Sequence, residues 1–382
     1  YIGQLLYISN YFKHRSDNQT QEPSKIEHQK SFTDSINFEP ITSFSSKAID
    51  IAEAIEHYEE KLNYKKTIYL SPDGVYNKIN INALYTPSDD YYIKKKNLIY
   101  LNSLLELIVK IPKINTQNNK ALLFGDPNFS LDSIKYNIFS KKLSEDADLN
   151  EYSKRDFRNI YLADLPYTRQ EIKTIGSILN QHNWDTLIFL GDYAIEENFK
   201  NADNPRLIHI ATHGYFAENL TRDDTDQKLY LGMNWNNVFK NPMLRSGLLL
   251  AGCQTTINGE YKLTSGYEDG ILSANEIMNM DLTKNELVVL SACNSGRGEI
   301  RPGEGVFGLQ RAFKIAGARS ILLSLWPVED KSTKLLMEYF YRLWLSGMNK
   351  REALKAAQLK LMQDPFYNHP LYWGAFILVG DN

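Results

Sequence analysis

The chain has 382 residues, enough for two or three domains, and its 43% hydrophobic and 23% charged residues are typical of a globular protein. Its formal net charge of −3 excludes the strongly basic footprint of a protein that binds nucleic acid or an acidic membrane surface. No apolar run approaches the roughly 18 residues that span a bilayer, and the opening YIGQLLYISNYF has no secretory signal. We therefore expect a cytoplasmic protein that contacts neither nucleic acid nor a membrane directly.

Cysteine usage narrows the chemistry further. The chain has two cysteines, Cys253 and Cys293, which are too few for a disulfide framework and indicate a reducing compartment. With scattered histidines they also make a poor set of zinc ligands, so we predict no metal and no organic cofactor. Because the chain does not begin with Met, we expect a fragment of a longer chain or a processed one.

The first part of the chain is less regular than the rest. Residues 13–46 are polar and aperiodic, which predicts a long loop or linker within an N-terminal segment spanning 1–64. A short helix is predicted at 47–63. The following KKTIYLSPDGVYNKININALY combines a strand, a PDG turn and an alternating run, a pattern typical of β-structure.

From about residue 120, apolar β runs alternate with helical patterns. Helices are predicted at 168–180, from 192, and at 271–279, 304–317, 332–345 and 350–361. Thr168 is a candidate N-cap of the first, and Glu171 would complete a capping box. Strands are predicted at 121–127, 186–191, 207–214, 247–253, 287–296, 320–328 and 373–380, the last closing the sheet. Their uninterrupted apolar runs predict an α/β fold with a mainly parallel sheet flanked by helices.

Two strand ends carry residues suited to catalysis. Ligands of such sheets bind beyond the carboxyl ends of the strands. His213 ends one predicted strand and is followed by Gly214, while Cys293 ends another between small residues. A thiolate nucleophile, an imidazole acid/base and backbone N–H groups for the oxyanion are the parts that cysteine proteolysis needs. His213, Cys293 and the N–H groups of Gly214 and Cys293 can supply them.

The residues alone leave other interpretations open. A cysteine at the end of a buried strand is more often a small core residue than a nucleophile. Cys253 also ends an apolar run, GLLLAGC, and competes with Cys293 as the reactive sulfur. His209 lies inside its strand, so we expect a structural histidine with a partner in the core.

The motifs around these residues resemble a known family. IHIATHGYF, followed by ELVVLSACNSGRG, is similar to the CHAT family of caspase-like peptidases, relatives of caspases and separase. LFGDP, LPYTRQEIKTI, EDGILSANEI, GEGVFGLQRAFKIAGARSILLSLWPVEDKST and HPLYWGAFILVGD resemble CHAT signatures in the same order, so the resemblance covers roughly 65–382. It implies a smaller, degenerate caspase-like half at 65–164 and an active caspase-like half at 165–382. It also implies that Cys293 is the nucleophile and His213 the general acid/base.

The resemblance also suggests a substrate preference. In the separase-like branch, an acidic residue after the LW motif contacts a basic P1 side chain, and Asp330 is the matching position here. A carboxylate pairs well with the planar fork of arginine, so we expect cleavage after Arg and less readily after Lys. Alternatively, Asp330 only caps the helix that begins near Ser332. Asp269 and Glu268 are further acidic candidates for the cleft.

Regulation and rival functions follow from the same features. We expect a protein substrate, and a regulatory protein or upstream domains of a longer chain that order the loops at 217–245 and 296–304. The expected setting is regulated proteolysis in a bacterium, with antiviral defence as one role. One rival is a catalytically silent caspase-like scaffold. The other, a nucleotide-binding module, should have a Gly-rich loop after its first strand, which LFGDPNF does not supply.

Overall fold

The computed structural model describes residues 67–72, 77–84, 90–108, 119–130, 162–217, 229–230, 233–234, 240–258, 268–292, 298–301 and 305–381. The predicted loop at 13–46 and the predicted helix at 47–63 lie outside the described residues, as does Cys293.

One mixed, mostly parallel sheet forms the centre of the described chain. Its strands follow the order β1 (Thr67–Leu70), β2 (Asn97–Tyr100), β14 (Phe376–Gly380), β13 (Ser320–Ser324), β10 (Leu287–Ala292), β5 (Leu207–Phe216), β3 (Lys120–Pro127) and β4 (Asp185–Gly191). Neighbours along this path are parallel except β13 and β14. Every residue of β10 and β13 is buried, as expected for parallel strands covered on both faces.

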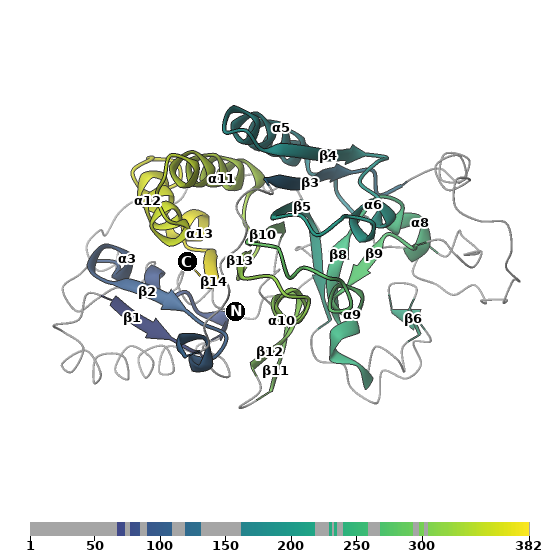
Figure 1. The fold of residues 1–382 in the computed structure, drawn as a ribbon, viewed down its shortest axis with the longest axis horizontal. Helices are drawn as coiled ribbons and strands as arrows, with labels where there is room; N and C mark the ends of the chain where they lie inside the picture. The colour runs from purple at the N-terminus through teal and green to yellow at the C-terminus, as the bar shows by residue number, and fades with distance from the viewer. Residues whose placement is uncertain are drawn as a thin grey trace, which may run out of the picture.

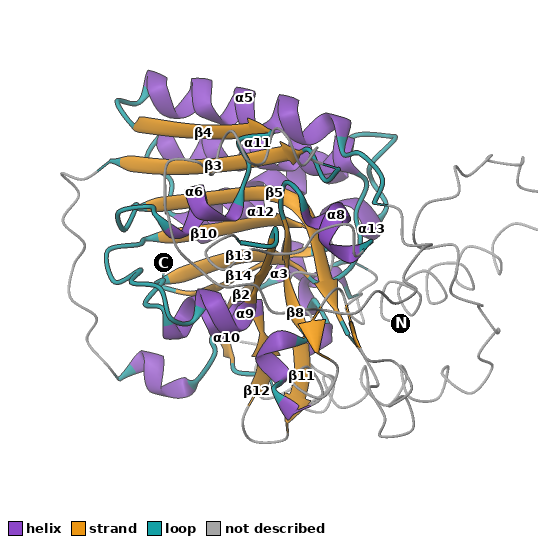
Figure 2. Cartoon of the chain, turned by 90° about the vertical axis from the view of Figure 1, so that its right-hand side faces the viewer, coloured by secondary structure: helices purple, strands orange, loops and turns teal. Residues whose placement is uncertain are grey.

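Smaller antiparallel elements surround this sheet. β8 (Ser246–Leu249) pairs with the end of β5, and β9 (Ile271–Ser273) pairs with β8. Figure 2 shows the main strands stacked, with β8 at a steep angle to the stack. Two separate pairs are β6 (Leu229–Tyr230) with β7 (Met233–Asn234), and β11 (Gly298–Arg301) with β12 (Gly305–Gly308).

Helices cover both faces of the sheet. α5 (Pro166–Gln181), α11 (Asp330–Leu345), α12 (Lys350–Met362) and the short α13 (Pro370–Trp373) lie on one side, and α6 (Glu196–Lys200), α9 (Ala274–Ile277) and α10 (Leu309–Ile315) on the other (Figure 1). α5 buries Ile172, Ile175 and Leu179, whose spacing forms one helical face. The remaining helices are α3 (Tyr92–Lys95), α8 (Cys253–Ile257) and 3-10 turns at Ile81–Ala83, Leu104–Leu107 and Pro242–Leu244.

The structure corrects several local predictions. Thr168 is not the N-cap of its helix, because α5 begins at Pro166 after Leu165, and the Thr168 hydroxyl donates to the Leu165 carbonyl. Glu171 therefore completes no capping box and turns into the core instead. The helices predicted from 192 and 304 begin at Glu196 and Leu309, the latter after strand β12. The stretch predicted as a helix at 271–279 contains β9 and then α9, and Ser273 and Glu276 form a capping box there.

The sheet also extends further than predicted. β14 does not close it, since Val379 of β14 pairs with Tyr100 of β2, and β1 follows β2. β3 lies between β4 and β5, so described strands on both sides of residue 165 share one sheet. The predicted division into halves at 65–164 and 165–382 stays a prediction.

Two apolar clusters hold these elements together. The larger contains the central strands with α5, α10, α11 and α12. The smaller lies around the β5–β8–β9 extension and consists of Phe129, Leu162, Tyr215, Leu249, Cys253, Ile257 and Ile271. It fixes the direction in which β5 leaves the parallel sheet. No helix among the described residues is long and apolar enough to cross a membrane.

Candidate active site

The carboxyl ends of β5 and β10 lie side by side. Ala292, the last residue of β10, is in register with Thr212 of β5. β5 continues beyond this point, and its next residue, His213, pairs with Leu249 of β8 instead. His213 thus lies where β5 leaves the parallel sheet. Cys293 follows Ala292 in the sequence and lies outside the described residues, so its pairing with His213 stays a prediction.

A backbone carbonyl orients the His213 imidazole. Nε2 of His213 lies 2.8 Å from the carbonyl oxygen of Ala163, and the ring centroid lies 5.3 Å from that of Phe129. Because a carbonyl oxygen can only accept a hydrogen bond, Nε2 carries the proton of the neutral ring. Nδ1 is then the nitrogen that can take up a proton and release it again. Burial lowers the pKa of His213, although the bond to Ala163 opposes this effect. The neutral imidazole is the form that can act as a base.

A pocket opens beside these strand ends. Its lining comes from the ends of β5, β10 and β13, from β14, and from the N-terminal turns of α5 and α11. Its lining residues are Leu165, Thr168, Glu171, Thr212, Ser291, Ala292, Ser324, Val328, Asp330, Thr333 and Phe376.

Asp330 is one of two carboxylates in this cavity. Burial, followed by the nearby charges of Glu171 and Glu329, raises the pKa of Asp330 to about 6. Asp330 is the first residue of α11, whose N-cap residue is Glu329, and no side chain makes a capping bond there. Asp330 is therefore not the N-cap of α11, so the alternative interpretation of this residue is wrong. The helix N-terminus still favours its negative charge.

The family of the chain is now clear, since residues 48–381 match the model of the CHAT domain. The chain belongs to the CHAT domain family. Among curated relatives, tetratricopeptide repeat protein 28 from Homo sapiens is 32% identical over 112 residues, and that from Mus musculus is 31% identical over the same length. These 112 residues are 29% of this chain and 4% of each relative, so this CHAT domain matches only a small part of those proteins.

Solved structures resemble the CHAT domain more remotely. The Arg-specific cysteine proteinase gingipain R has a TM-score of 0.43 and 12% identity, over 89% of this chain and 68% of that one. The Saccharomyces cerevisiae separase–securin complex has a TM-score of 0.45 and 13% identity, over 92% of this chain and 17% of that one. At this level the similarity carries no inference about activity.

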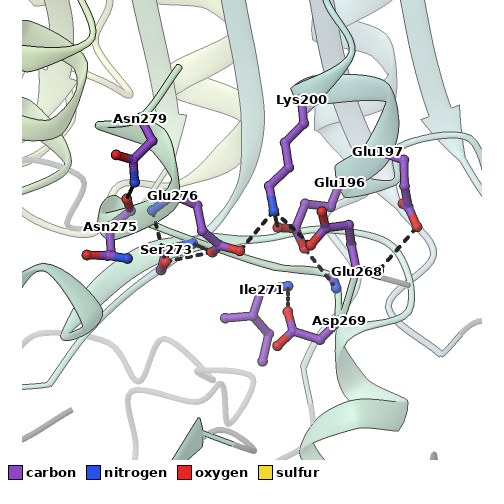
Figure 3. A network of polar contacts seen from close by, with 11 residues as sticks. Glu196, Glu197, Lys200, Glu268, Asp269, Ile271, Ser273, Asn275, Glu276 and Asn279 are labelled. Carbon is purple, nitrogen blue, oxygen red and sulfur yellow. Dashed lines mark hydrogen bonds and ion pairs between the residues drawn. The ribbon is translucent and has the colours of Figure 1, made fainter. Parts of the chain in front are cut away.

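Asp269 and Glu268 do not line the cavity of the CHAT domain. Glu268 belongs to an ion-pair cluster around Lys200, and Asp269 lies beside that cluster (Figure 3). Nζ of Lys200 lies 2.7 Å from Glu196 Oε1, 2.7 Å from Glu268 Oε2 and 2.9 Å from Glu276 Oε1. Burial, then the charges of Glu276 and Glu268, raises the pKa of Asp269 to about 6 despite a backbone N–H bond from Ile271. Oxygen atoms of Glu196, Glu268 and Glu276 lie within 4.8 Å of one another, as metal ligands would, and the Lys200 ammonium contacts all of them.

Cys253 and His209 are both core residues. Cys253 is fully buried in the smaller apolar cluster, where burial raises the pKa of its thiol well above the usual value. A protonated, inaccessible thiol is a poor nucleophile, which weakens Cys253 as a rival to Cys293. His209 is also fully buried and has the core partners that its position predicts, Glu171 and Tyr341.

Gly214 lies in the β5–β8 ladder opposite Leu248, and its role as an oxyanion donor stays a prediction. Sequence reasoning missed Ala163, Glu171 and Ser291 as site residues. Ala163 acts through its carbonyl, which every residue type has. A weak signal existed for Glu171, since a carboxylate on an otherwise apolar helical face needs a partner.

Proposed function

We propose that this CHAT domain is a cysteine endopeptidase that cleaves protein substrates after a basic residue. The observation that carries the proposal is the position of the acidic cavity, which adjoins the strand ends that bear His213 and precede Cys293. A substrate whose P1 side chain enters the cavity would present its scissile carbonyl at this edge of the sheet.

The proposed chemistry uses the orientation of His213. Nδ1 takes the thiol proton of Cys293, and the thiolate attacks the scissile carbonyl carbon. The N–H groups of Gly214 and Cys293 stabilise the oxyanion. The imidazolium then protonates the leaving amine as the C–N bond breaks, and water hydrolyses the thioester with His213 again as the base. The bond from Nε2 to the Ala163 carbonyl supports this cycle because it holds one ring orientation throughout.

Regulation forms part of the proposal. A regulatory protein, or upstream domains of a longer chain, would order the segments at 217–245 and 296–304, which flank the two catalytic strands in the sequence. Basal peptidase activity would then be low and would rise when the partner binds.

The test compares the wild type with Cys293→Ala, and with Cys253→Ala as the matched control. Purified protein is incubated with proteins encoded beside it and with a peptide library, and mass spectrometry locates the cleaved bonds. We expect cleavage after Arg, or more weakly Lys, that Cys293→Ala abolishes and Cys253→Ala retains. Cleavage that persists in Cys293→Ala would refute the nucleophile. If no partner or peptide elicits cleavage, the scaffold function replaces the peptidase.

A further inference from the structure

A buried hydrogen-bond chain lies beneath the cavity. His209 Nε2 lies 2.9 Å from Glu171 Oε1, and His209 Nδ1 lies 3.0 Å from the Tyr341 hydroxyl. Tyr341 and His209 are fully buried, and Glu171 is 1% exposed. Of the three, Glu171 also lines the cavity. These hydrogen bonds therefore connect the core between β5 and α11 to the part of the cavity that α5 lines.

The positions of the protons in this chain follow from its donors and acceptors. Burial, together with the charge of Glu171, raises the pKa of Tyr341 well above its usual value, so the phenol keeps its proton. If Tyr341 donates to Nδ1, then Nε2 carries the imidazole proton and donates it to Glu171. In this arrangement the Tyr341 hydroxyl and the His209 N–H each have an acceptor. The arrangement fixes the carboxylate plane, as an orienting partner does for other functional side chains.

Three acceptors in the cavity remain without partners among the described residues. Oε1 of Glu171 receives the bond from His209, whereas Oε2 has no such bond. The Asp330 carboxylate likewise has no hydrogen bond or ion pair within the described part of the chain. The Ser291 hydroxyl is buried and makes no hydrogen bond. Among them the Ser291 oxygen is fully buried, and leaving such a group without a partner is costly, so a ligand with several N–H donors would stabilise this cavity.

The geometry of the three acceptors favours a guanidinium over an ammonium. They come from three different elements, α5, α11 and β10, and therefore face the cavity from different sides. A guanidinium spreads five N–H donors over a plane, whereas an ammonium is a compact point charge that holds its water more strongly. A planar ligand with several donors can serve all three acceptors at once.

We propose that Glu171 is a second specificity residue of this cavity, oriented by His209 and Tyr341, and that it acts with Asp330 and Ser291 to select arginine over lysine. This inference rests on the proposed peptidase function and adds to it the residues that discriminate the P1 side chain. His209 and Tyr341 are positioning residues, since they act through Glu171.

The kinetic test uses P1 citrulline, a neutral isostere of arginine. For each variant, kcat/KM is measured on matched peptides with Arg, Lys or citrulline at P1. Glu171→Gln keeps the side-chain shape and the bond from His209. We expect both its Arg/Lys and its Arg/citrulline ratio to fall, the latter at least about tenfold, as for the loss of one hydrogen bond to a charged group. Tyr341→Phe should lower the Arg/citrulline ratio by about threefold, through a higher KM for the P1 arginine peptide. Glu338 is a partly buried carboxylate that pairs with Arg342 outside the cavity, so Glu338→Gln is the matched control and should change nothing.

If the Tyr341–His209–Glu171 hydrogen bonds had a purely structural role, Glu171→Gln and Tyr341→Phe would lower the melting temperature but leave the Arg/citrulline ratio unchanged. That result would overturn the inference. A binding measurement separates it from the proposed function. Calorimetry with arginine amide on the Cys293→Ala protein should give binding that Glu171→Gln weakens at least about tenfold. If arginine amide binds in this way but the wild-type protein cleaves no peptide, the proposed peptidase function is refuted and the assignment of the cavity as a guanidinium site is retained. An unaltered ratio in an active enzyme would refute the role of Glu171 alone.

Discussion

Two groups of buried and partly buried carboxylates in this molecule differ in what balances their charge. Around Lys200, Glu196, Glu268 and Glu276 all contact one internal ammonium. In the cavity, Asp330 and Glu171 adjoin each other, and the described lining residues include no basic side chain. A carboxylate cluster that contains its own cation ties elements together, here α6 to α9 and to the segment before β9. A cluster without one is suited to a cationic ligand.

The largest expected effect comes from removing the internal cation. Lys200→Met leaves the buried Glu196 carboxylate without its main counter-charge, and we expect the free energy of unfolding to fall by about 3 kcal/mol. Chemical denaturation measures this change. Lys120→Met removes an exposed ion pair with Asp203 and is the control, with an expected loss of under about 1 kcal/mol. Equal losses in the two variants would remove the distinction between the clusters.

The cavity should show the opposite behaviour, with a large effect on substrate selection and a small one on folding. Asp330→Asn should lower kcat/KM for P1 arginine by about a hundredfold, as expected for a lost charge-assisted hydrogen bond, and leave P1 citrulline nearly unchanged. Glu268→Gln is the matched control from the Lys200 cluster. A larger loss of P1 arginine cleavage in Glu268→Gln than in Asp330→Asn would reverse our assignment of the two sites.

The smallest expected effect is the number of protons that Asp330 releases when a cationic ligand binds. The pKa of Asp330 is raised to about 6 by burial, and a bound cation lowers the pKa of a carboxyl group. At pH 6, arginine amide should therefore displace about half a proton from Asp330, and above pH 8 almost none. Calorimetry in buffers of different ionisation enthalpy gives this number. Asp269 has a similarly raised pKa but lies in the Lys200 cluster, so Asp330→Asn should abolish the release, and Asp269→Asn should not.

Features of the fold and the site that depend on local sequence could be predicted, whereas those that depend on contacts between distant residues could not. Apolar runs located the parallel strands, because burial on both faces leaves a continuous hydrophobic pattern. The position of His209 inside its strand correctly predicted a core partner. In contrast, Glu171 matched a capping box three residues after Thr168, and the tertiary contact with His209 overrode that local pattern.

Long-range pairing explains the remaining errors. β14 has the composition of a central strand, and nothing within it specifies whether a strand from about 280 residues earlier lies beside it. The orientation of His213 depends on the backbone of Ala163, which is 50 positions away and has no distinguishing side chain. Strand-end residues together with the resemblance to the CHAT family predict the His213–Cys293 pair, and the resemblance alone predicts the P1 role of Asp330; both stay predictions.

β5 is one continuous strand of ten residues that belongs first to the parallel sheet and then to the β8 ladder. His209 lies in the first part, bonded to Glu171, and His213 lies in the second. Four residues of extended chain separate their Cα atoms by about 13 Å. β5 thus sets the distance between His209, which supports the proposed specificity pocket, and His213, the proposed catalytic base. Surrounding loops could be exchanged to alter regulation, while that distance, and with it the register of the cleaved bond, would stay constant.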